Sequence, residues 1–395
     1  MTSTQRIAAI DITRALTMLL MIFVNDLWSL HDIPLWLEHT AAEEDGMGLA
    51  DTVFPAFLFI VGMSIPYAIA NRIKKGDTTG QLLRHVLERS VALLVMGLFL
   101  VNGENLHAEA TGIPRGVWNI LSCLSFIFIW NQYPPSWSPL ARNILKGTGI
   151  IILLLLAWIC RCGQGTEITR FGTHWWGILG LIGWAYFVSA MIFVAGKGRF
   201  TVNVVAWLCC LMLSMATHGR LFTYPHWLST ILGPVAYGAM PALVLGGVVV
   251  SQLFRRYSAA GQWKMVTGVL PALGAVLLMA GFLTRPVFEI SKIRATPSWV
   301  LICSAITIGL FVFTYWLGDL KQKAHWFRVI GPAGSDTLLC YLIPYFIYAI
   351  MGMTGAALPA IMLGGAIGIG KSLLFAVLMI QIAGLLSKQG IRLKL

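Results

Sequence analysis

The chain has 395 residues, of which 57% are hydrophobic and 11% charged, and its mean hydropathy is +0.78. A soluble domain carries about 25% charged residues, so this composition excludes an ordinary water-soluble globular protein. The net charge of +12 would suggest nucleic-acid binding in a soluble protein, but in a membrane protein it is expected from Lys and Arg in cytoplasmic loops. We therefore expect an all-α, polytopic integral membrane protein without a nucleic-acid partner.

Each expected helix is an apolar run close to the roughly 20 residues that a bilayer crossing needs. Short polar joints separate these runs, so residues 1–395 are expected to form a single transmembrane domain. The first run has no small-residue cleavage pattern after it, which argues against a cleavable signal. Residues 358–368 are compatible with a re-entrant segment. The twelve expected helices are Ala9–Leu30, Asp51–Arg72, Arg84–Asn102, Val117–Gln132, Asn143–Cys160, Trp175–Ala195, Phe200–Thr217, Ser229–Leu253, Met265–Thr284, Pro297–Gly318, Ser335–Met353 and Gly370–Leu386.

The loop charges predict the orientation of these helices. With both termini on one side of the membrane, that side carries 20 Lys and Arg residues and the other side carries 7. Because Lys and Arg accumulate in cytoplasmic loops, the excess predicts that both termini are cytoplasmic. An odd number of crossings would remove this bias from the later loops.

The cysteines and glycines indicate no bound metal or nucleotide-binding loop. Most of the 7 Cys lie inside apolar runs, while Cys160 and Cys162 flank Arg161 at a helix end. No spacing resembles a metal site, so we interpret all seven as structural. The glycine-rich stretch 364–370 follows no strand and is better interpreted as flexible helix joints than as a dinucleotide-binding loop.

Acidic residues are concentrated at the start of the chain, where eight of the 16 lie between Asp11 and Asp51. Ionisable groups at membrane helices are costly and are functional candidates by default. Asp11 and Arg14 share one face of the first helix. They form either a surface anchor or a polar lining at the cytoplasmic side. Asp26 ends the first helix, and Asp51 opens the second, where capping alone could explain a carboxylate.

His39 lies in the loop between the first two helices, on the same side of the membrane as Asp26, Glu38 and Asp51. A neighbouring carboxylate can fix the tautomer of a histidine and stabilise its charged form, which is the usual arrangement of a general base. A histidine in a loop is more often an ordinary surface residue. The spacing alone therefore leaves both interpretations of His39 open.

Three further residues are candidates at other helix ends, although an ordinary helix end is the simpler interpretation of each. Asn102 ends the third helix and Trp299 begins the tenth, both on the side of His39, and we expect both to bind substrate. Asp336 opens the eleventh helix near the cytoplasmic side, where we expect a cofactor. Basic groups on that side suit the phosphates of a nucleotide.

The first two helices carry a motif that resembles heparan-α-glucosaminide N-acetyltransferase and its bacterial relatives. The motif is Asp-x-x-Arg, Phe-Val-Asn, a loop His, and then Gly-x-x-x-Ala-Asp-x-Val-Phe-Pro-x-Phe-x-Phe-Ile-x-Gly. The match is strongest over residues 8–70, with weaker similarity at 296–299 and 334–345. Residues 133–228 show no match and are expected to include an extra helix pair. The motif residues are Asp11, Arg14, Asn25, His39, Gly46, Ala50, Asp51, Phe54, Pro55, Phe57, Phe59 and Gly62.

The resemblance implies acetyl transfer across a membrane. Acetyl-CoA is used from the cytosol, and the acetyl group reaches an amino sugar or other saccharide on the far side. His39 takes the catalytic role, Asn25 and Asp51 line the site, and we add Asp26 to the substrate side. Asp11, Arg14 and Asp336 are assigned to the cofactor side. A bacterial inner membrane and a homodimer are further expectations.

Two departures from the family pattern bear on the site. His39 lies twelve residues before Asp51, a longer spacing than in the animal enzyme, and His31 is a competing loop histidine. The family's Asp-Pro-Glu-Gly stretch is replaced by Gly-Pro-Val-Ala-Tyr-Gly at 233–238, which implies a different acceptor contact.

Two other functions remain open at this point. A transporter of a sugar or cell-wall fragment fits twelve helices, although no repeat relates residues 1–195 to 196–395. The second is a scaffold protein, which would not explain the acidic residues at the ends of the first two helices.

Overall fold

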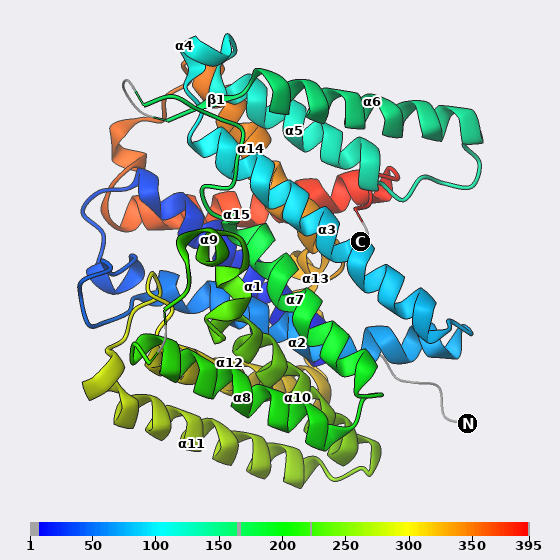
Figure 1. Cartoon of the computed structure of the whole chain (residues 1–395), viewed down its shortest axis with the longest axis vertical. Helices are drawn as coiled ribbons and strands as arrows, with labels where there is room; N and C mark the ends of the chain where they lie inside the picture. The colour runs from blue at the N-terminus through cyan, green and yellow to red at the C-terminus, as the bar shows by residue number, and fades with distance from the viewer. Residues whose placement is uncertain (1–7, 164–166, 222, 394–395) are drawn as a thin grey trace.

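The structure is a computed structural model that describes residues 8–163, 167–221 and 223–393, and its regular structure is almost entirely helical (Figure 1). The longer helices are α1 (Ala8–Asp26), α2 (Leu49–Lys74), α3 (Thr79–Glu104), α5 (Arg115–Trp130), α6 (Pro139–Ile159), α7 (Gly177–Ala195), α8 (Phe200–His218), α9 (His226–Ala236), α10 (Ala239–Ala259), α11 (Trp263–Phe288), α12 (Pro297–Thr314), α14 (Thr337–Thr354) and α15 (Gly365–Lys388). Shorter elements include α4 (Ala108–Thr111), α13 (Gly331–Ser335), the π-helical turn η3 (Tyr315–Leu320) and the two-residue strands β1 (Arg161–Cys162) and β2 (Thr169–Arg170).

Among the described residues, eleven helices are long and apolar enough to cross a membrane, which confirms an all-α integral membrane protein. Each of the twelve predicted segments corresponds to a helix, but the fourth, Arg115–Trp130, has only 16 residues. At 1.5 Å per residue α5 spans about 24 Å, less than the roughly 30 Å hydrocarbon core. The predicted number of twelve is therefore one too high by the criterion of length.

Two predicted segments differ in their internal structure. The segment Ser229–Leu253 is broken into α9 and α10, because Gly238 takes a left-handed conformation with φ of 76° between them. Residues 358–368 form no buried re-entrant helix. They contain one 3-10 turn, Ala360–Met362, whose residues are exposed, and α15 already begins at Gly365.

The centre of the bundle is the contact between α2 and α10. Glycines bring the two backbones close together: a Cβ on Gly62 would lie 1.9 Å from the Val244 carbonyl oxygen, and a Cβ on Gly247 would lie 1.9 Å from that of Phe59. Small residues permit this approach, which is a common way to pack helices in a membrane. The start of α2, which carries Asp51, is thereby attached to the most buried part of the protein.

We expect Gly62→Ala to destabilise the protein by about 1–3 kcal/mol, because the added methyl group meets a backbone carbonyl that cannot move aside. Gly268 in α11 is the matched control, since a Cβ there meets no atom within 4 Å. Gly268→Ala should be neutral or stabilising, as an alanine favours a helix over glycine. Thermal unfolding of the two variants in detergent measures the difference, and equal stability would contradict the α2–α10 contact.

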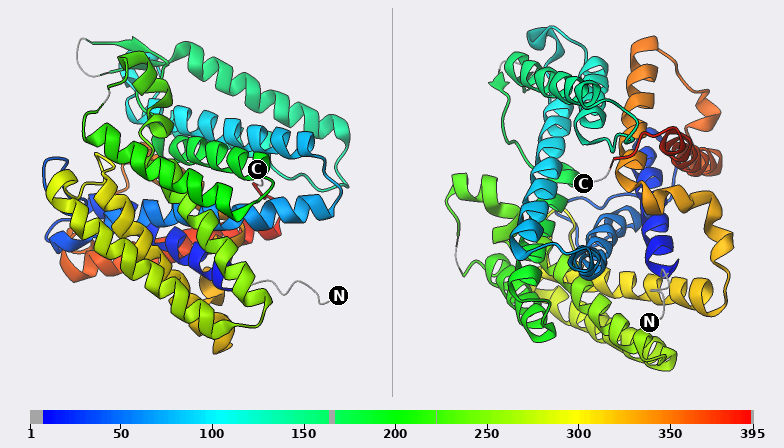
Figure 2. Two further views of the ribbon diagram at one scale, coloured as in Figure 1. Left: turned by 60° about the horizontal axis from the view of Figure 1, so that its bottom comes forward. Right: turned by 90° about the vertical axis from the view of Figure 1, so that its right-hand side faces the viewer.

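The remaining helices surround this centre. Helix α3 packs along α7, α11 packs along α12, and α5 packs against α6 and α14. Helix α6 lies at the outer edge of the bundle, as the right-hand view of Figure 2 shows, and only 17% of its most apolar window is buried. Its exposed apolar side chains suit contact with lipid, because a helix in a bilayer needs no polar outer face.

Contacts between loops divide the helix ends into two faces. The loop 27–48 contacts residues 285–290 and 363–365, the segment 105–111 contacts 161–163, and Trp176 contacts residues 230–231. We call this end the His39 face. At the opposite face the start of α1 contacts Asp319, and Asn131 contacts Arg392. Figure 1 shows the loop before α2 and strand β1 at the left and the α2–α3 and α5–α6 turns at the right.

Candidate active site

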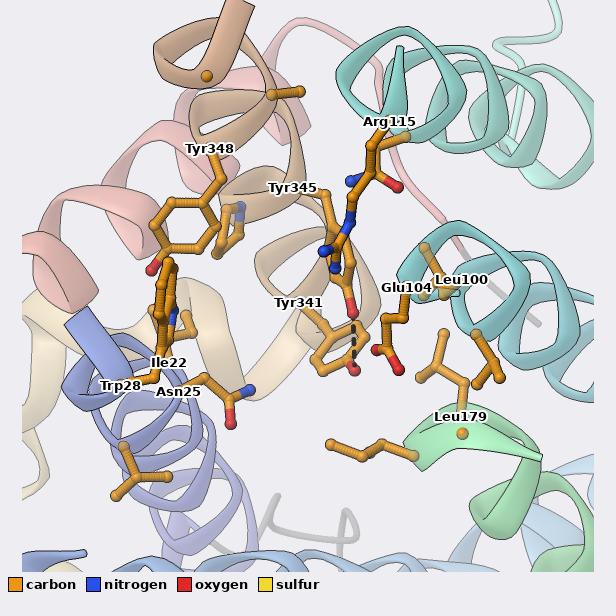
Figure 3. Close-up of a pocket in the computed structure, with 18 of the residues that line it drawn as sticks. Ile22, Asn25, Trp28, Leu100, Glu104, Arg115, Leu179, Tyr341, Tyr345 and Tyr348 are labelled. Atoms are coloured by element: carbon orange, nitrogen blue, oxygen red, sulfur yellow. Dashed lines mark hydrogen bonds between the residues drawn. The ribbon is translucent and has the colours of Figure 1, made fainter. Parts of the chain in front are cut away.

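A cavity of about 1510 Å³ lies between α1, α3, α5, α7 and α14 (Figure 3). Most of its lining residues come from loops of the His39 face or from the helix turns near that face, while Tyr341 lies close to the opposite end of α14. His39 and Glu38 reach it from the loop before α2, and Asn25 and Trp28 from the end of α1. The sequence therefore brings its expected catalytic histidine to a large, partly polar cavity.

His39 is paired with Asp51, one of the three carboxylates that the sequence places on its side of the membrane. The His39 Nδ1 atom lies 2.7 Å from Asp51 Oδ1, and the carboxylate side chain is only 1% exposed whereas the imidazole is 46% exposed. An ionised carboxylate accepts hydrogen bonds only, so Nδ1 carries the proton and Nε2 carries the lone pair. The arrangement supplies an oriented base or nucleophile in a cavity.

The Asp51 carboxylate is fixed from three directions. Its Oδ2 atom accepts hydrogen bonds from the backbone amides of Thr40 and Gly48, each at 3.0 Å, and its Oδ1 atom faces His39. Asp51 is also in the first turn of α2, where a carboxylate is favoured by the unpaired amides. A Cβ on Gly48 would lie 2.0 Å from the Glu38 carbonyl oxygen, so glycine lets the loop close on the carboxylate.

Lys292 is a third member of this group, and no local spacing predicts its position beside His39. Its Nζ atom lies 3.2 Å from His39 Nδ1, 3.4 Å from His39 Nε2 and 4.0 Å from Asp51 Oδ1. Burial lowers the pKa of the Lys292 ammonium, while Asp51 acts in the opposite direction. The ammonium group of Lys292 therefore lies against the imidazole ring that opens onto the cavity.

Asp45 attaches the loop of His39 to the loop of Lys292. Its carboxylate accepts a hydrogen bond from the Ile290 amide at 2.7 Å and from Arg285 Nε at 2.9 Å. Burial acts to raise the pKa of Asp45, but these hydrogen bonds outweigh it and the pKa is lowered. This charged contact therefore fixes the loop that carries His39 relative to the loop that carries Lys292.

The two neighbouring residues Asn25 and Asp26 have different surroundings. Asn25 is exposed to the cavity, as Figure 3 shows. Asp26 is 3% exposed and accepts hydrogen bonds from Tyr348, Lys371 and Ser372, each at 2.6 Å. It does not line the cavity. The expected direct contact of Asp26 with substrate is replaced by a buried ion pair that fixes the wall formed by Tyr348.

Asn102 and Trp299 are also outside the cavity lining. Asn102 is fully buried, and its amide bonds Leu98, the backbone of Gly172 and the thiol of Cys162. Trp299 is fully buried and donates its indole N–H to the Asp51 carbonyl oxygen at 3.0 Å. Neither side chain is accessible to a ligand. Both instead stabilise the backbone around the site through their hydrogen bonds.

Asp11, Arg14 and Asp336 lie at the other end of α1. Arg14 bonds Asp11 at 3.2 Å, the Gly334 carbonyl oxygen at 2.7 Å and Ser64 at 2.8 Å. Asp336 follows Gly334 by two residues and is 7% exposed. Along α1, Asp11 and Asn25 are separated by about 21 Å at the helical rise. The cavity has no lining residue from this inner group.

A polar wall that the sequence did not predict stands within the cavity. Glu104 from α3, Arg115 from α5 and the tyrosines Tyr341 and Tyr345 from α14 face one another in Figure 3. The two tyrosine hydroxyls lie 3.4 Å apart, and Glu104 acts electrostatically on both rings and on Arg115. Among the described residues neither Glu104 nor Arg115 has an ion-pair partner, so both charges are available to a ligand.

The described residues contain no group of three or more His, Cys, Asp or Glu side chains that could hold a metal ion.

The comparisons with known proteins extend the motif resemblance. Residues 6–155 match the family model described as heparan-alpha-glucosaminide N-acetyltransferase, catalytic. The Mus musculus heparan-alpha-glucosaminide N-acetyltransferase is 30% identical over 148 residues, which are 34% of this chain and 21% of that protein. The Homo sapiens protein of the same name is 32% identical over 101 residues, or 25% of this chain and 14% of its own length. The chain thus matches about a fifth or less of the length of these relatives. Over residues 6–155 this membrane protein is therefore similar to the catalytic domain of the heparan-alpha-glucosaminide N-acetyltransferase family, which confirms the resemblance that its motif indicated.

Proposed function

We propose that this protein is a membrane-bound acyltransferase that moves an acetyl group from acetyl-CoA to an amino sugar or other saccharide. The observation that carries the proposal is the buried Asp51 carboxylate, 2.7 Å from a His39 imidazole that opens onto a cavity. The family of the matched segment supports acetyl-CoA as the donor and a sugar as the acceptor. Asp51 orients the ring and balances charge, and His39 performs the chemistry.

The chemistry at His39 can follow two courses that share the same residues. In direct transfer, Nε2 takes the proton of the acceptor amine or hydroxyl, which attacks the thioester carbon as the carbon–sulfur bond breaks. The proton then passes to the CoA thiolate. In the covalent course, Nε2 itself attacks the thioester carbon, the carbon–sulfur bond breaks and CoA leaves as its thiolate. The acceptor then attacks the acetyl carbon, the carbon–nitrogen bond to the ring breaks, and the proton that the acceptor loses balances the released thiolate. Ping-pong kinetics distinguish the second course from the first.

We assign Lys292 as a positioning residue that holds the His39 ring. Lys292→Met should lower kcat without an equal loss of thermal stability, because the ring loses the ammonium group that lies 3.2–3.4 Å from its nitrogens. Lys292→Arg keeps a charged donor and should restore part of the lost kcat. An unchanged kcat in Lys292→Met would contradict this role.

The wall of Glu104, Arg115, Tyr341 and Tyr345 is proposed as the acceptor side of the cavity. Tyrosine rings offer flat apolar surface with a polar end, and a carboxylate accepts hydrogen bonds from hydroxyl groups. Arg115 suits a carboxylate, sulfate or phosphate group on the same acceptor. We propose that Asn25 contacts the reacting groups from α1. These features favour an acidic saccharide as the acceptor.

Arg115→Ala should raise the KM for an acidic saccharide by about tenfold or more, because a charge-assisted hydrogen bond contributes about 1.5–3 kcal/mol. The KM for a neutral saccharide and for acetyl-CoA should stay unchanged. Arg170→Ala is the control, since Arg170 lies in β2 on the same face and does not line the cavity. A rise in the KM for acetyl-CoA alone would instead assign Arg115 to the phosphates of the donor.

We also propose twelve crossings with both termini in the cytoplasm of a bacterial inner membrane. Two features support α5 as a crossing in spite of its length. The Ala8 and Ala9 amides donate hydrogen bonds to Asp319 at 3.1 and 2.8 Å, so the start of α1 and Asp319 lie on the same side of the membrane. The chain must therefore cross the membrane an even number of times between these residues, and the number is even only if α5 is counted as a crossing. The link between Asn131 and Arg392 likewise joins the end of α5 to the end of the chain. With the excess of Lys and Arg on this side, His39 faces the periplasm.

In this orientation acetyl-CoA approaches from the face that carries Asp11, Arg14 and Asp336, which remain our proposed cofactor-side residues. Arg14 joins α1, α2 and α13 at that end, because it donates hydrogen bonds to Asp11, Ser64 and the Gly334 carbonyl oxygen. The thioester must pass between the helices to reach His39. A tilt of α14 or α1 would open such a path, since conformational steps of this kind are common in enzymes with closed sites.

The proposal is tested with purified protein, labelled acetyl-CoA and a panel of neutral, acidic and amino saccharides. We expect label on at least one saccharide and release of an equal amount of CoA. Uptake of a saccharide into protein-containing vesicles without acetyl-CoA, together with no label transfer, would contradict the proposal and favour a transporter.

A further inference from the structure

The outer loop between α6 and α7 contains two cysteines whose side chains meet. The Sγ atoms of Cys160 and Cys162 lie 3.1 Å apart, and both residues are fully buried. A disulfide bond is about 2.05 Å long, so a shift of about 1 Å would join the two sulfurs. The other five cysteines have no such sulfur neighbour among the described residues. This pair serves no step of the acetyl transfer.

The pair is tied to the segment that presents Glu104 to the cavity. The Gly163 amide donates to the Asn105 carbonyl oxygen, and the His107 amide donates to that of Arg161, at 3.0 and 2.9 Å. The Cys162 thiol lies 3.3 Å from the Asn102 side-chain oxygen. A covalent bond at this point would stiffen the end of α3 on one side of the cavity.

The surroundings also favour reaction of one sulfur. The hydrogen bond from Cys160 lowers the pKa of the Cys162 thiol to about 6, burial opposes this shift, and His174 adds to it. A thiol with such a pKa is largely a thiolate at neutral pH, which is the form that reacts in disulfide exchange. Both sulfurs are buried, so the loop has to open locally for an oxidant to reach Cys162.

We propose that Cys160 and Cys162 form a disulfide bond in the mature protein. The bond is formed by exchange with a disulfide-carrying oxidant of the compartment that the His39 face contacts, which is oxidising if that face is periplasmic. The Cys162 thiolate attacks the disulfide of the oxidant, and one thiolate leaves. Cys160 loses its proton and attacks the Cys162 sulfur, and the second thiolate leaves. Two thiols of the protein are oxidised, and the disulfide of the oxidant is reduced to two thiols.

The test counts free thiols in the full-length protein. Membranes are treated with N-ethylmaleimide, denatured in the same reagent without reductant, and analysed by mass spectrometry. We expect five of the 7 cysteines to be alkylated, and all 7 after reduction. The peptide that contains Cys160 and Cys162 should be lighter by two hydrogens before reduction. Alkylation of all seven without reductant, or any modification other than the loss of two hydrogens, would overturn the proposal.

Two variants assign the bond to this pair. Cys162→Ser should leave Cys160 free, so that all remaining cysteines are alkylated without reductant. Cys209→Ser removes an exposed cysteine of α8 and should leave the bond intact. The wild-type measurement decides the proposal even if Cys162→Ser fails to fold. It is also independent of acetyl transfer, because the bond is counted whether or not the protein turns over a substrate.

Discussion

Replacing His39 with alanine should lower kcat for acetyl transfer by about 10²–10⁴-fold while the protein keeps its fold and its binding of acetyl-CoA. General acid–base catalysis by a positioned side chain contributes an effect of this size, and loss of a covalent intermediate would be at least as severe. The imidazole is 46% exposed, so its removal leaves no tightly packed void. Steady-state kinetics with labelled acetyl-CoA, together with the thermal stability of the variant, measure both parts of this expectation.

His31→Ala is the matched control for this variant. His31 lies in the same loop, its side chain is 64% exposed, and its Nδ1 atom lies 2.9 Å from Asp32. It also has a carboxylate partner, but it does not line the cavity. We expect His31→Ala to retain wild-type kcat. If His31→Ala lost activity and His39→Ala kept it, the site assignment would have to move to the competing histidine.

Asp51→Asn should lower kcat by about 10²–10⁴-fold and also destabilise the protein. The NH2 group of the asparagine can face His39 Nδ1, and the ring must then adopt the other tautomer, with the proton on Nε2. Alternatively, the NH2 group can face the backbone amides of Thr40 and Gly48, which are themselves hydrogen-bond donors. The second arrangement leaves buried donors unpaired, at a cost of about 1–3 kcal/mol. The loss of kcat should exceed what the lower stability explains at the assay temperature.

Asp319→Asn is the control that separates a loss of kcat from a loss of stability. Asp319 likewise accepts two backbone hydrogen bonds, from Ala8 and Ala9, but it lies at the opposite face and outside the cavity. We expect this variant to lose stability without a specific loss of kcat. Equal losses of kcat in Asp51→Asn and Asp319→Asn at matched stability would show that the Asp51 carboxylate acts only on the fold.

Local sequence patterns were sufficient for most of the helices and for the central pair of the site. A bilayer crossing requires a long apolar run, so length and hydropathy located every helix of that kind. The pairing of His39 with Asp51 followed from the motif, because a loop and the first turn of the next helix lie close together whatever the rest of the fold does. Twelve residues separate His39 from Asp51, and the loop between them folds back so that its Thr40 and Gly48 amides both donate hydrogen bonds to Asp51.

The parts that sequence could not supply depend on contacts between distant segments. Lys292 reaches His39 across 253 positions, and Lys371 neutralises Asp26 across 345. No local spacing encodes such pairs. Asn102 was expected to contact substrate because polar residues at helix ends often do, but tertiary packing turned its amide to the backbone of Gly172 instead. Arg115 and Glu104 were visible as charges at helix ends, yet only the fold shows that they share a cavity with two tyrosines.

The most direct test of the account is a structure of the full chain with a non-hydrolysable acetyl-CoA analogue. In the covalent course we expect the carbonyl carbon that replaces the reactive acetyl carbon to lie about 3–3.5 Å from His39 Nε2, the separation of a reactive complex. In direct transfer the same carbon should face His39 across a space that holds one acceptor atom. The nucleotide should lie toward the opposite face of the bundle. Density for the acyl group at a site that His39 cannot reach would contradict the proposed acetyl transfer.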